Sequence, residues 1–192
     1  MKNTSILITG VGGQGTLFAS KIFGQLAISM GFDVKLSEVH GMAQRGGSVV
    51  THVRFGDKIA SPIIDKGGAD YILSFELMET MRWLDYLKPD GEVYVNDQKI
   101  LPMPVIIGAA EYPGDLKEKI TQYCGSATFI DALALAKESG SAKAVNTVML
   151  GVIAKKLTDI PKKEWEKALG TVCKPAFLDA NLTAFNKGYD AV

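Results

Sequence analysis

Short apolar runs and amphipathic segments alternate through the first two thirds of the chain. Residues Ser5 to Gly10 form a run of β-branched residues and Leu that ends in glycine, which is typical of a buried parallel strand. The segment after this run carries an apolar stripe with helical spacing and stops before Gly31. The stripe comprises Leu17, Ile22, Phe23, Leu26, Ala27 and Met30. The chain therefore opens with a strand and a helix.

The same two periodicities predict the remaining elements. Strands are expected over residues 34–39, 48–55, 69–75, 92–96, 105–108 and 128–130. Helices are expected over residues 76–87 and 115–123 and, beyond Asp131, over 132–138, 142–157, 162–172 and 178–186. The turn signal Lys88-Pro89-Asp90-Gly91 joins one predicted helix to the next strand, as in a βαβ unit.

This order of elements predicts an α/β fold. We expect three layers, a mainly parallel sheet, a Rossmann-like βα glycine turn near the N-terminus and a helical C-terminal part. No repeat, low-complexity tract or Pro/Ser-rich linker interrupts the sequence, so residues 1–192 are expected to form a single domain. Ala144, Gly151 and Ala154 predict close packing of the helix over residues 142–157.

The balance of charge argues against a nucleic-acid partner. The 192 residues include 21 Lys plus Arg and 21 Asp plus Glu, and the pI is about 6.7. Proteins that neutralise phosphates normally have a high pI or a clustered basic stripe. Apolar residues make up 47% and charged residues 22% of the chain, which is typical of a globular protein.

The cysteines and histidines are too few and too scattered for a metal centre. Cys124 and Cys173 are far apart in sequence, and neither lies near His40 or His52. A zinc site or an iron–sulfur cluster needs about four such ligands at short spacings. Two cysteines of this kind fit a reducing compartment, and no apolar run approaches the ~18 residues of a membrane span. We therefore expect a cytoplasmic protein that holds no metal and contacts no membrane.

A glycine-rich turn follows the first strand. Gly10-Val11-Gly12-Gly13-Gln14-Gly15 matches G-x-G-x-x-G at the start of a helix, where free backbone N–H groups attract anions. Thr16 stands where a phosphate-binding P-loop would have Lys, so the motif is not a P-loop. The glycines could equally serve tight strand–helix packing or seat a partner chain.

A second segment rich in glycine and polar residues lies between the strands predicted over 34–39 and 48–55. Its sequence is Glu38-Val39-His40-Gly41-Met42-Ala43-Gln44-Arg45-Gly46-Gly47-Ser48. An Arg beside two glycines can clamp a carboxylate or a phosphate, whereas an isolated Arg-Gly-Gly is more often a turn with a salt bridge. We expect both glycine segments to lie at the carboxyl ends of neighbouring strands, where open α/β sheets bind ligands.

Two further polar residues are assigned structural roles. His52 alternates with Thr51 and Val53 in a predicted strand, and a lone strand histidine is more often hydrogen-bonded than a ligand. Asn146 lies in an otherwise apolar helix and is expected to be a satisfied buried amide between helices.

Three separated motifs together resemble the gamma-type domain of 2-oxoacid:ferredoxin oxidoreductases. They are the glycine turn, the segment from Glu38 to Val49, and Lys143-Ala144-Val145-Asn146-Thr147-Val148-Met149-Leu150-Gly151. Within that family, His-Gly-Met-Ala-Gln-Arg-Gly-Gly is most similar to the beta subunit of indolepyruvate:ferredoxin oxidoreductases. The resemblance extends from Ile6 to about Tyr189.

The resemblance implies oxidative decarboxylation of an aryl 2-oxoacid to an acyl-coenzyme A, with ferredoxin as the electron acceptor. In this family the thiamine diphosphate, Mg and iron–sulfur clusters belong to a larger alpha-type catalytic subunit. This chain is therefore expected to be an accessory subunit, inactive alone, that binds none of these cofactors and reaches ferredoxin through the complex.

The predicted site is a crevice that faces the partner's active site and binds coenzyme A, the substrate carboxylate or the partner itself. Its residues are Gly12, Gly13, Gln14, Gly15, His40, Met42, Gln44, Arg45, Gly46, Gly47 and Ser48. Arg45 is the expected anion contact, and the glycine N–H groups are the expected donors.

Two alternatives remain open on the sequence. One is a gamma subunit that serves pyruvate, 2-oxoglutarate or branched-chain 2-oxoacids. The other is a free-standing nucleotide-binding protein, in which Glu38 would hold the ribose of NAD or a flavin nucleotide.

Overall fold

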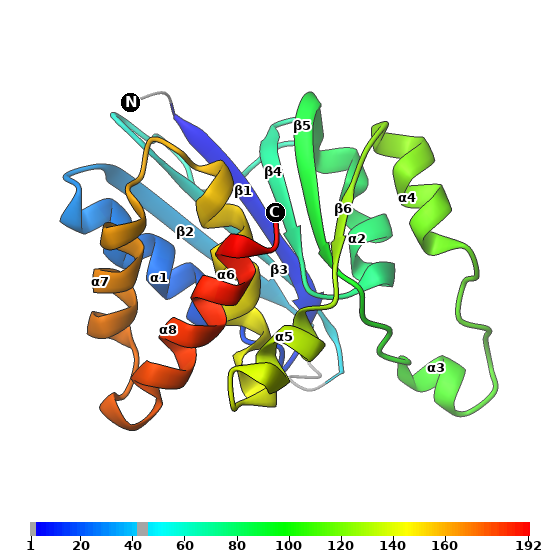
Figure 1. Ribbon diagram of the computed structural model, residues 1–192. Helices are drawn as coiled ribbons and strands as arrows, with labels where there is room; N and C mark the ends of the chain where they lie inside the picture. The colour runs from blue at the N-terminus through cyan, green and yellow to red at the C-terminus, as the bar shows by residue number, and fades with distance from the viewer. Residues whose placement is uncertain (1–2, 42–45) are drawn as a thin grey trace.

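A six-stranded sheet with the order β2-β3-β1-β4-β5-β6 forms the centre of the computed structural model, which describes residues 3–41 and 46–192 (Figure 1). The strands are β1 (Thr4–Val11), β2 (Asp33–His40), β3 (Ser48–Gly56), β4 (Ala69–Ser74), β5 (Leu87–Asn96) and β6 (Thr128–Ile130). The pairs β1–β4, β4–β5 and β5–β6 are parallel. The predicted mainly parallel sheet is therefore confirmed.

Strand β3 is the exception, because it runs antiparallel to both of its neighbours, β1 and β2. Strands β1 and β2 consequently point the same way but are not adjacent. Their carboxyl ends lie at the same edge of the sheet, with the start of β3 between them, since Ser48 pairs with Val11 and Val49 pairs with His40. The predicted edge is correct, and the predicted direct adjacency of the two strands is wrong.

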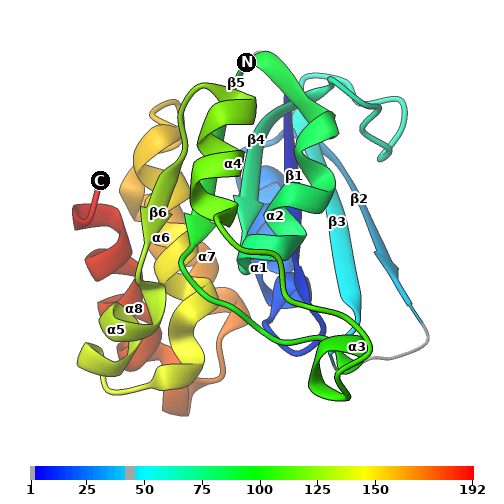
Figure 2. The ribbon, with the colours of Figure 1, turned by 90° about the vertical axis from the view of Figure 1, so that its right-hand side faces the viewer.

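Helices cover both faces of the sheet, which gives the three predicted layers (Figures 1 and 2). The helices are α1 (Thr16–Ser29), α2 (Leu77–Trp83), α3 (Met103–Ile106), α4 (Leu116–Cys124), α5 (Ala132–Glu138), α6 (Val145–Lys156), α7 (Lys162–Val172) and α8 (Pro175–Asp190). In β1, Ile6 and Ile8 contribute to the core on the side of α1 and α6, and Leu7 contributes to the core on the side of α2 and α4. Both faces are buried, so the central residues of the strand, Ile6 to Ile8, are apolar.

The largest error concerns residues 105–108, which form no strand. Pro102 precedes a short helix, α3, and Gly108 follows it with φ +74°. The neighbours of β5 are β4 and β6, and this apolar run pairs with neither edge strand of the sheet. Ile106 and Ile107 are exposed and Val105 is half-buried.

Several boundaries also differ from the sequence prediction. The helix predicted over residues 76–87 is α2, which Glu76 caps at its N-terminus, followed by the 3-10 helix η1 (Leu84–Tyr86). Strand β5 begins at Leu87, and residues 88–91 bulge out between the pairs Ala69–Leu87 and Tyr71–Glu92. Residues 142–144 form the 3-10 helix η2 and α6 begins at Val145, while α8 extends beyond the predicted 178–186 at both ends.

Helices α6 and α8 approach each other closely through two glycines. An added Cβ would lie 2.0 Å from the carbonyl oxygen of Phe185 at Gly151 and 1.9 Å from the carbonyl oxygen of Val148 at Gly188. These distances leave no room for a Cβ at position 151 or at position 188. The close packing predicted for residues 142–157 is confirmed, and Phe185 and Trp165 stack beside it at 6.2 Å.

Replacing Gly151 with alanine should destabilise the fold by roughly 2 kcal/mol or more, because the methyl group forces α6 and α8 apart. Chemical denaturation would measure this effect. The matched control is Gly170→Ala in α7, where an added Cβ meets nothing within 4 Å. There alanine should stabilise the helix by about 0.5–1 kcal/mol. Equal effects at the two positions would contradict the role given to the α6–α8 contact.

Candidate functional site

The two glycine segments meet at the carboxyl edge of the sheet. The N–H of Gly12 donates to the carbonyl of Gly47 at 2.8 Å, and the N–H of Gly46 donates to the carbonyl of Gly12 at 3.3 Å. The antiparallel pairing of β1 with β3 places the segments side by side, because it aligns the end of one strand with the start of the other. The predicted proximity of the two segments is confirmed.

A cavity of about 440 Å³ opens beside this contact. It is lined by Gly12, Gly13, Gly15, Thr16, Leu17, Glu38, His40 and Val49. Four of these residues, Gly12, Gly13, Gly15 and His40, were predicted for the site. The first turn of α1 forms part of the wall, and the first N–H groups of a helix lack partners within the helix. The predicted site did not include Thr16 and Leu17, which follow the glycine motif, or Val49, which ends the second motif.

The Glu38 carboxylate lies in this wall and is already hydrogen-bonded. Its Oε2 accepts from the hydroxyl of Thr16 at 3.3 Å and from that of Thr51 at 3.1 Å. In a dinucleotide fold the acidic strand would lie directly beside the glycine strand, whereas here β3 separates them. Both observations weigh against Glu38 as a ribose ligand.

The third motif also reaches the glycine turn. Gly15 has φ +87°, and an added Cβ would lie 2.2 Å from Nδ2 of Asn146. This Nδ2 is 3.5 Å from the carbonyl oxygen of Gly15, and the Asn146 Oδ1 accepts from the hydroxyl of Thr147 at 3.3 Å. Asn146 is therefore an amide packed on the glycine turn, whereas the sequence analysis placed it only between helices.

A second cavity, of about 370 Å³, lies on the other side of the start of α1. Its wall combines two aromatic rings with amide, hydroxyl and ammonium groups. The lining residues are Phe18, Ser141, Lys143, Ala144, Asn146, Phe177, Ala180 and Asn181. Sequence reasoning did not predict this cavity, because η2 and α8 come close to α1 only in the folded chain.

Two predicted site residues use their side chains within the protein. Gln14 accepts from the N–H of Val11 at 2.7 Å and donates to the carbonyl of Phe75 at 2.7 Å. Ser48 donates to the buried carboxylate of Glu79. Neither side chain is in the wall of the first cavity.

The remaining predicted site residues lie around the glycine contact or outside the described chain. The N–H of Gly46, predicted as a free donor, donates to Gly12. The predicted residues Met42, Gln44 and Arg45 fall outside the described residues. In the described part of the first cavity's wall, Glu38 and His40 are the only residues with titratable side chains.

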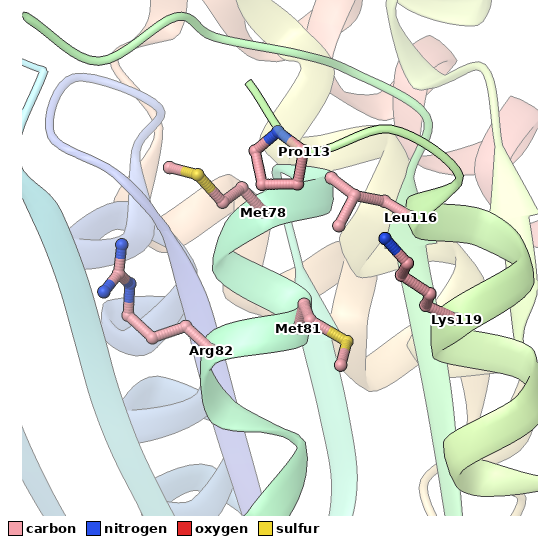
Figure 3. Close-up of a pocket in the computed structure, with 6 residues that line it drawn as sticks. All are labelled: Met78, Met81, Arg82, Pro113, Leu116 and Lys119. Atoms are coloured by element: carbon pink, nitrogen blue, oxygen red, sulfur yellow. The ribbon is translucent and has the colours of Figure 1, made fainter. Parts of the chain in front are cut away.

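A third depression, of about 280 Å³, lies between α2 and α4 (Figure 3). Met78, Met81 and Arg82 from α2, Leu116 and Lys119 from α4, and Pro113 line it, and the Arg82 side chain extends away from α4. Arg82 pairs with Glu79 at 3.3 Å. The groove is mostly apolar and offers no acid–base pair, so the carboxyl edge remains the candidate site.

The structural role predicted for His52 agrees with its surroundings. Its Nδ1 accepts from the N–H of Ile64 at 3.1 Å, and its ring meets the edge of Tyr86. Burial lowers the pKa of this imidazole, so the neutral form that can accept the hydrogen bond is favoured. His52 takes no part in the candidate site.

The two cysteines cannot share one metal. Cys124 packs against the core on the side of α2 and α4, and Cys173 packs against the core on the side of α1 and α6. Burial raises the pKa of both thiols, which disfavours the thiolates that bind metals. Among residues 3–41 and 46–192, no three His, Cys, Asp or Glu residues gather as metal ligands, and no helix has the length and apolar character to cross a membrane.

Comparison with known proteins matches nearly the whole chain to one family. The model of the family described as pyruvate ferredoxin/flavodoxin oxidoreductase matches residues 5–191. Indolepyruvate oxidoreductase subunit IorB of Thermococcus kodakarensis is 38% identical over 195 residues, which cover 100% of this chain and 96% of that protein. The similarity therefore extends over both chains almost entirely.

Two other relatives contain the same region within longer chains. Ketoisovalerate oxidoreductase subunit VorA of Methanothermobacter marburgensis is 27% identical over 98% of this chain but only 36% of its own length. The structure of 2-oxoglutarate:ferredoxin oxidoreductase from Magnetococcus marinus, with 2-oxoglutarate, coenzyme A and succinyl-CoA bound, aligns with a TM-score of 0.71. It is 20% identical, and the match covers 99% of this chain and 31% of that one.

Replacing Gly15 with alanine should destabilise the protein more than replacing Gly13. Both positions have positive φ, which costs about 1 kcal/mol for a residue with a Cβ. Only at Gly15 does the added Cβ meet Asn146, whereas at Gly13 it meets nothing within 4 Å. Chemical denaturation of the two variants would measure the difference.

A double-mutant cycle isolates the contact between Gly15 and Asn146. Asn146→Ala should remove most of the extra cost of Gly15→Ala and leave the cost of Gly13→Ala unchanged. If Asn146→Ala shifted both costs equally, the packing of the third motif on the glycine turn would not be the cause.

Proposed function

The chain belongs to the pyruvate ferredoxin/flavodoxin oxidoreductase family, and we propose that it is the accessory subunit of an indolepyruvate-type 2-oxoacid:ferredoxin oxidoreductase. One observation carries the proposal: three motifs that are distant in sequence meet at the carboxyl edge of the sheet. Gly12 binds Gly47, and Gly15 packs under Asn146. The span of the family match, residues 5–191, supports one gamma-type domain over residues 1–192.

The proposed reaction converts an aryl 2-oxoacid and coenzyme A into an acyl-coenzyme A and carbon dioxide. Two electrons pass to ferredoxin and one proton is released. Thiamine diphosphate, when bound in the partner, supplies the carbanion chemistry of decarboxylation. The described residues of this chain are proposed to bind and orient the substrate or coenzyme A at the edge of the site and to exclude water from it.

We assign the thiamine diphosphate, Mg and iron–sulfur clusters to a larger alpha-type subunit. A cluster needs about four thiolates, and this chain has two cysteines, packed on opposite faces of the sheet. Ferredoxin would therefore take its electrons from the partner and not from this chain.

The crevice at the carboxyl edge is proposed to face the partner's active site and to contact coenzyme A or the substrate carboxylate. The first turn of α1, with its free N–H groups and positive dipole end, favours an anion there. In the sequence, Arg45 lies between the end of β2 at His40 and the start of β3 at Ser48, and it remains the proposed ion-pairing residue. The relative from Magnetococcus marinus has coenzyme A bound, which is consistent with this assignment.

An indolepyruvate-type substrate is favoured over a branched-chain one by the comparisons. The identity is 38% with the indolepyruvate oxidoreductase subunit and 27% with the ketoisovalerate oxidoreductase subunit. A free-standing nucleotide-binding protein is disfavoured, because the carboxylate it would use is already bound by Thr16 and Thr51.

Reconstitution with the larger subunit from the same source tests the proposed function. The chain alone should show no turnover and no visible absorbance. Added to the larger subunit, it should restore coenzyme A-dependent reduction of ferredoxin or a viologen dye with indolepyruvate. Bound flavin, or nicotinamide-dependent turnover by this chain alone, would contradict the proposal.

Within the reconstituted enzyme, Arg45→Ala should raise the KM for the 2-oxoacid or for coenzyme A by about 10-fold or more, since a charge-assisted contact contributes ~1.5–3 kcal/mol. Arg45→Lys keeps the charge but not the forked geometry and should cause a smaller loss. Steady-state kinetics against each substrate would measure both. Unchanged KM values and unchanged subunit affinity in Arg45→Ala would rule out the assignment.

A further inference from the structure

Exposed apolar side chains gather at the carboxyl edge of the sheet. Seven of the twelve large apolar residues exposed in the described chain come from elements that end or begin there. They are Leu17, Val39, Leu101, Met103, Ile106, Ile107 and Phe177. Their exposed fractions run from 49% at Leu101 to 68% at Ile107. A concentration of this kind marks an interaction surface, because scattered single residues are the norm elsewhere.

The segment from Leu101 to Ile107 contributes most of this surface and projects from the sheet edge with α3 (Figures 1 and 2). No charged residue occurs between Lys99 and Glu111. Such a segment cannot be explained as a solvated loop, since loops that stay in water are usually polar. Its apolar side chains also have no core of their own to enter.

The segment has a fixed conformation. The N–H of Ile106 donates to the carbonyl of Pro102 at 3.1 Å, and that of Ile107 donates to the carbonyl of Met103 at 3.0 Å. The N–H of Ala109 closes the turn on the carbonyl of Pro104 at 2.8 Å. The prolines restrict the backbone further. An apolar protrusion that is already ordered loses little conformational entropy when a partner covers it.

A buried carboxylate holds the base of the segment. Glu76, which is fully buried, accepts from the N–H of Ile100 at 3.1 Å, from the N–H of Glu79 at 2.8 Å and from the hydroxyl of Tyr112. Burial, followed by the hydrogen bond to Glu76, raises the pKa of Tyr112 and keeps its hydroxyl a donor. Both ends of the protrusion are thus tied to α2.

The lengths of two relatives favour a larger subunit as the occupant of this surface. In the ketoisovalerate oxidoreductase subunit the matching region is 36% of the chain, and in the 2-oxoglutarate enzyme it is 31%. There the domain is joined covalently to a larger remainder. The indolepyruvate oxidoreductase subunit, by contrast, matches this chain over 96% of its own length. A subunit of that size holds its neighbour through its own surface, where exposed apolar residues commonly act as anchors.

We infer that the larger catalytic subunit packs against the carboxyl edge of the sheet, with the segment from Leu101 to Ile107 as its apolar anchor. This inference rests on the proposed function. The bound subunit would bury the anchor and close over the adjoining cavity of about 440 Å³. The same contact would therefore join the subunits and complete the candidate site.

Titration of the purified chain onto the immobilised larger subunit tests the interface. The double variant Ile106→Ser with Ile107→Ser should bind roughly 100-fold or more weakly, because each buried Ile contributes about tenfold or more to affinity. The matched control is Ile28→Ser at the other end of α1, where the side chain is 67% exposed against 68% for Ile107. Its affinity should stay within about twofold of the wild type. Thermal unfolding of all variants should match the wild type, and Met103→Ser provides an independent second test.

The outcomes separate this inference from the proposed function. If the wild-type chain binds the larger subunit and restores turnover, while the double variant and Met103→Ser bind equally well, the interface is elsewhere and the function stands. If the wild-type chain neither binds nor restores turnover, the proposed function fails and the interface fails with it. If sedimentation shows a dimer of this chain that only the double variant dissociates, with subunit affinity unchanged, the anchor serves a second copy and the inference is overturned.

Discussion

The carboxyl ends of β1, β4 and β5 depend on three polar side chains that satisfy the backbone where the strands diverge. Asn96, which is fully buried, donates to the carbonyl of Phe75 at 3.1 Å and accepts from the N–H of Ala132 at 3.2 Å. Gln14 donates to the same carbonyl, and Glu76 accepts from the backbone of Ile100. A buried backbone group without a partner would cost about 1–3 kcal/mol, so these contacts decide how each loop leaves the sheet.

The geometry of the candidate site follows from that network. Gln14 ties the glycine turn to the end of β4, which fixes the start of α1 against the sheet. Gly15 can then lie directly under Asn146, and Gly12 can pair with Gly47. The sequence left two interpretations of the glycines open, close packing or ligand binding. The structure shows the packing, and the packing forms the wall of the cavity proposed to bind the ligand.

Most of the fold was accessible from the sequence because its signals are local. Apolar runs buried on both faces, such as the one containing Ile6 and Leu7, can be recognised without knowing their partners. The antiparallel insertion of β3 between β1 and β2 was not accessible, since alternation is the same in either direction. Thr16 and Phe177 reach the cavities only through tertiary packing, so no motif identifies them.

The error at residues 105–108 has a physical cause that bears on function. An apolar run is usually buried by its own chain, and on that ground the sequence predicts a strand over residues 105–108. In the structure these residues lie in and beside α3, and Ile106 and Ile107 face solvent. A sequence that retains apolar side chains there without a core to receive them is consistent with burial by another chain.

The proposed shared site would also resolve an electrostatic difficulty at the carboxyl edge. The described wall of the first cavity presents the Glu38 carboxylate, which would repel the carboxylate of a 2-oxoacid or the phosphates of coenzyme A. The hydroxyls of Thr16 and Thr51 reduce this charge but do not cancel it. We expect the compensating cation to come from Arg45 or from the partner. Excluding water on assembly would strengthen that attraction, because charges interact more strongly in a medium of low dielectric constant. The proposed anion site would therefore be complete only in the assembled enzyme, which is the arrangement expected of an accessory subunit that is inactive alone.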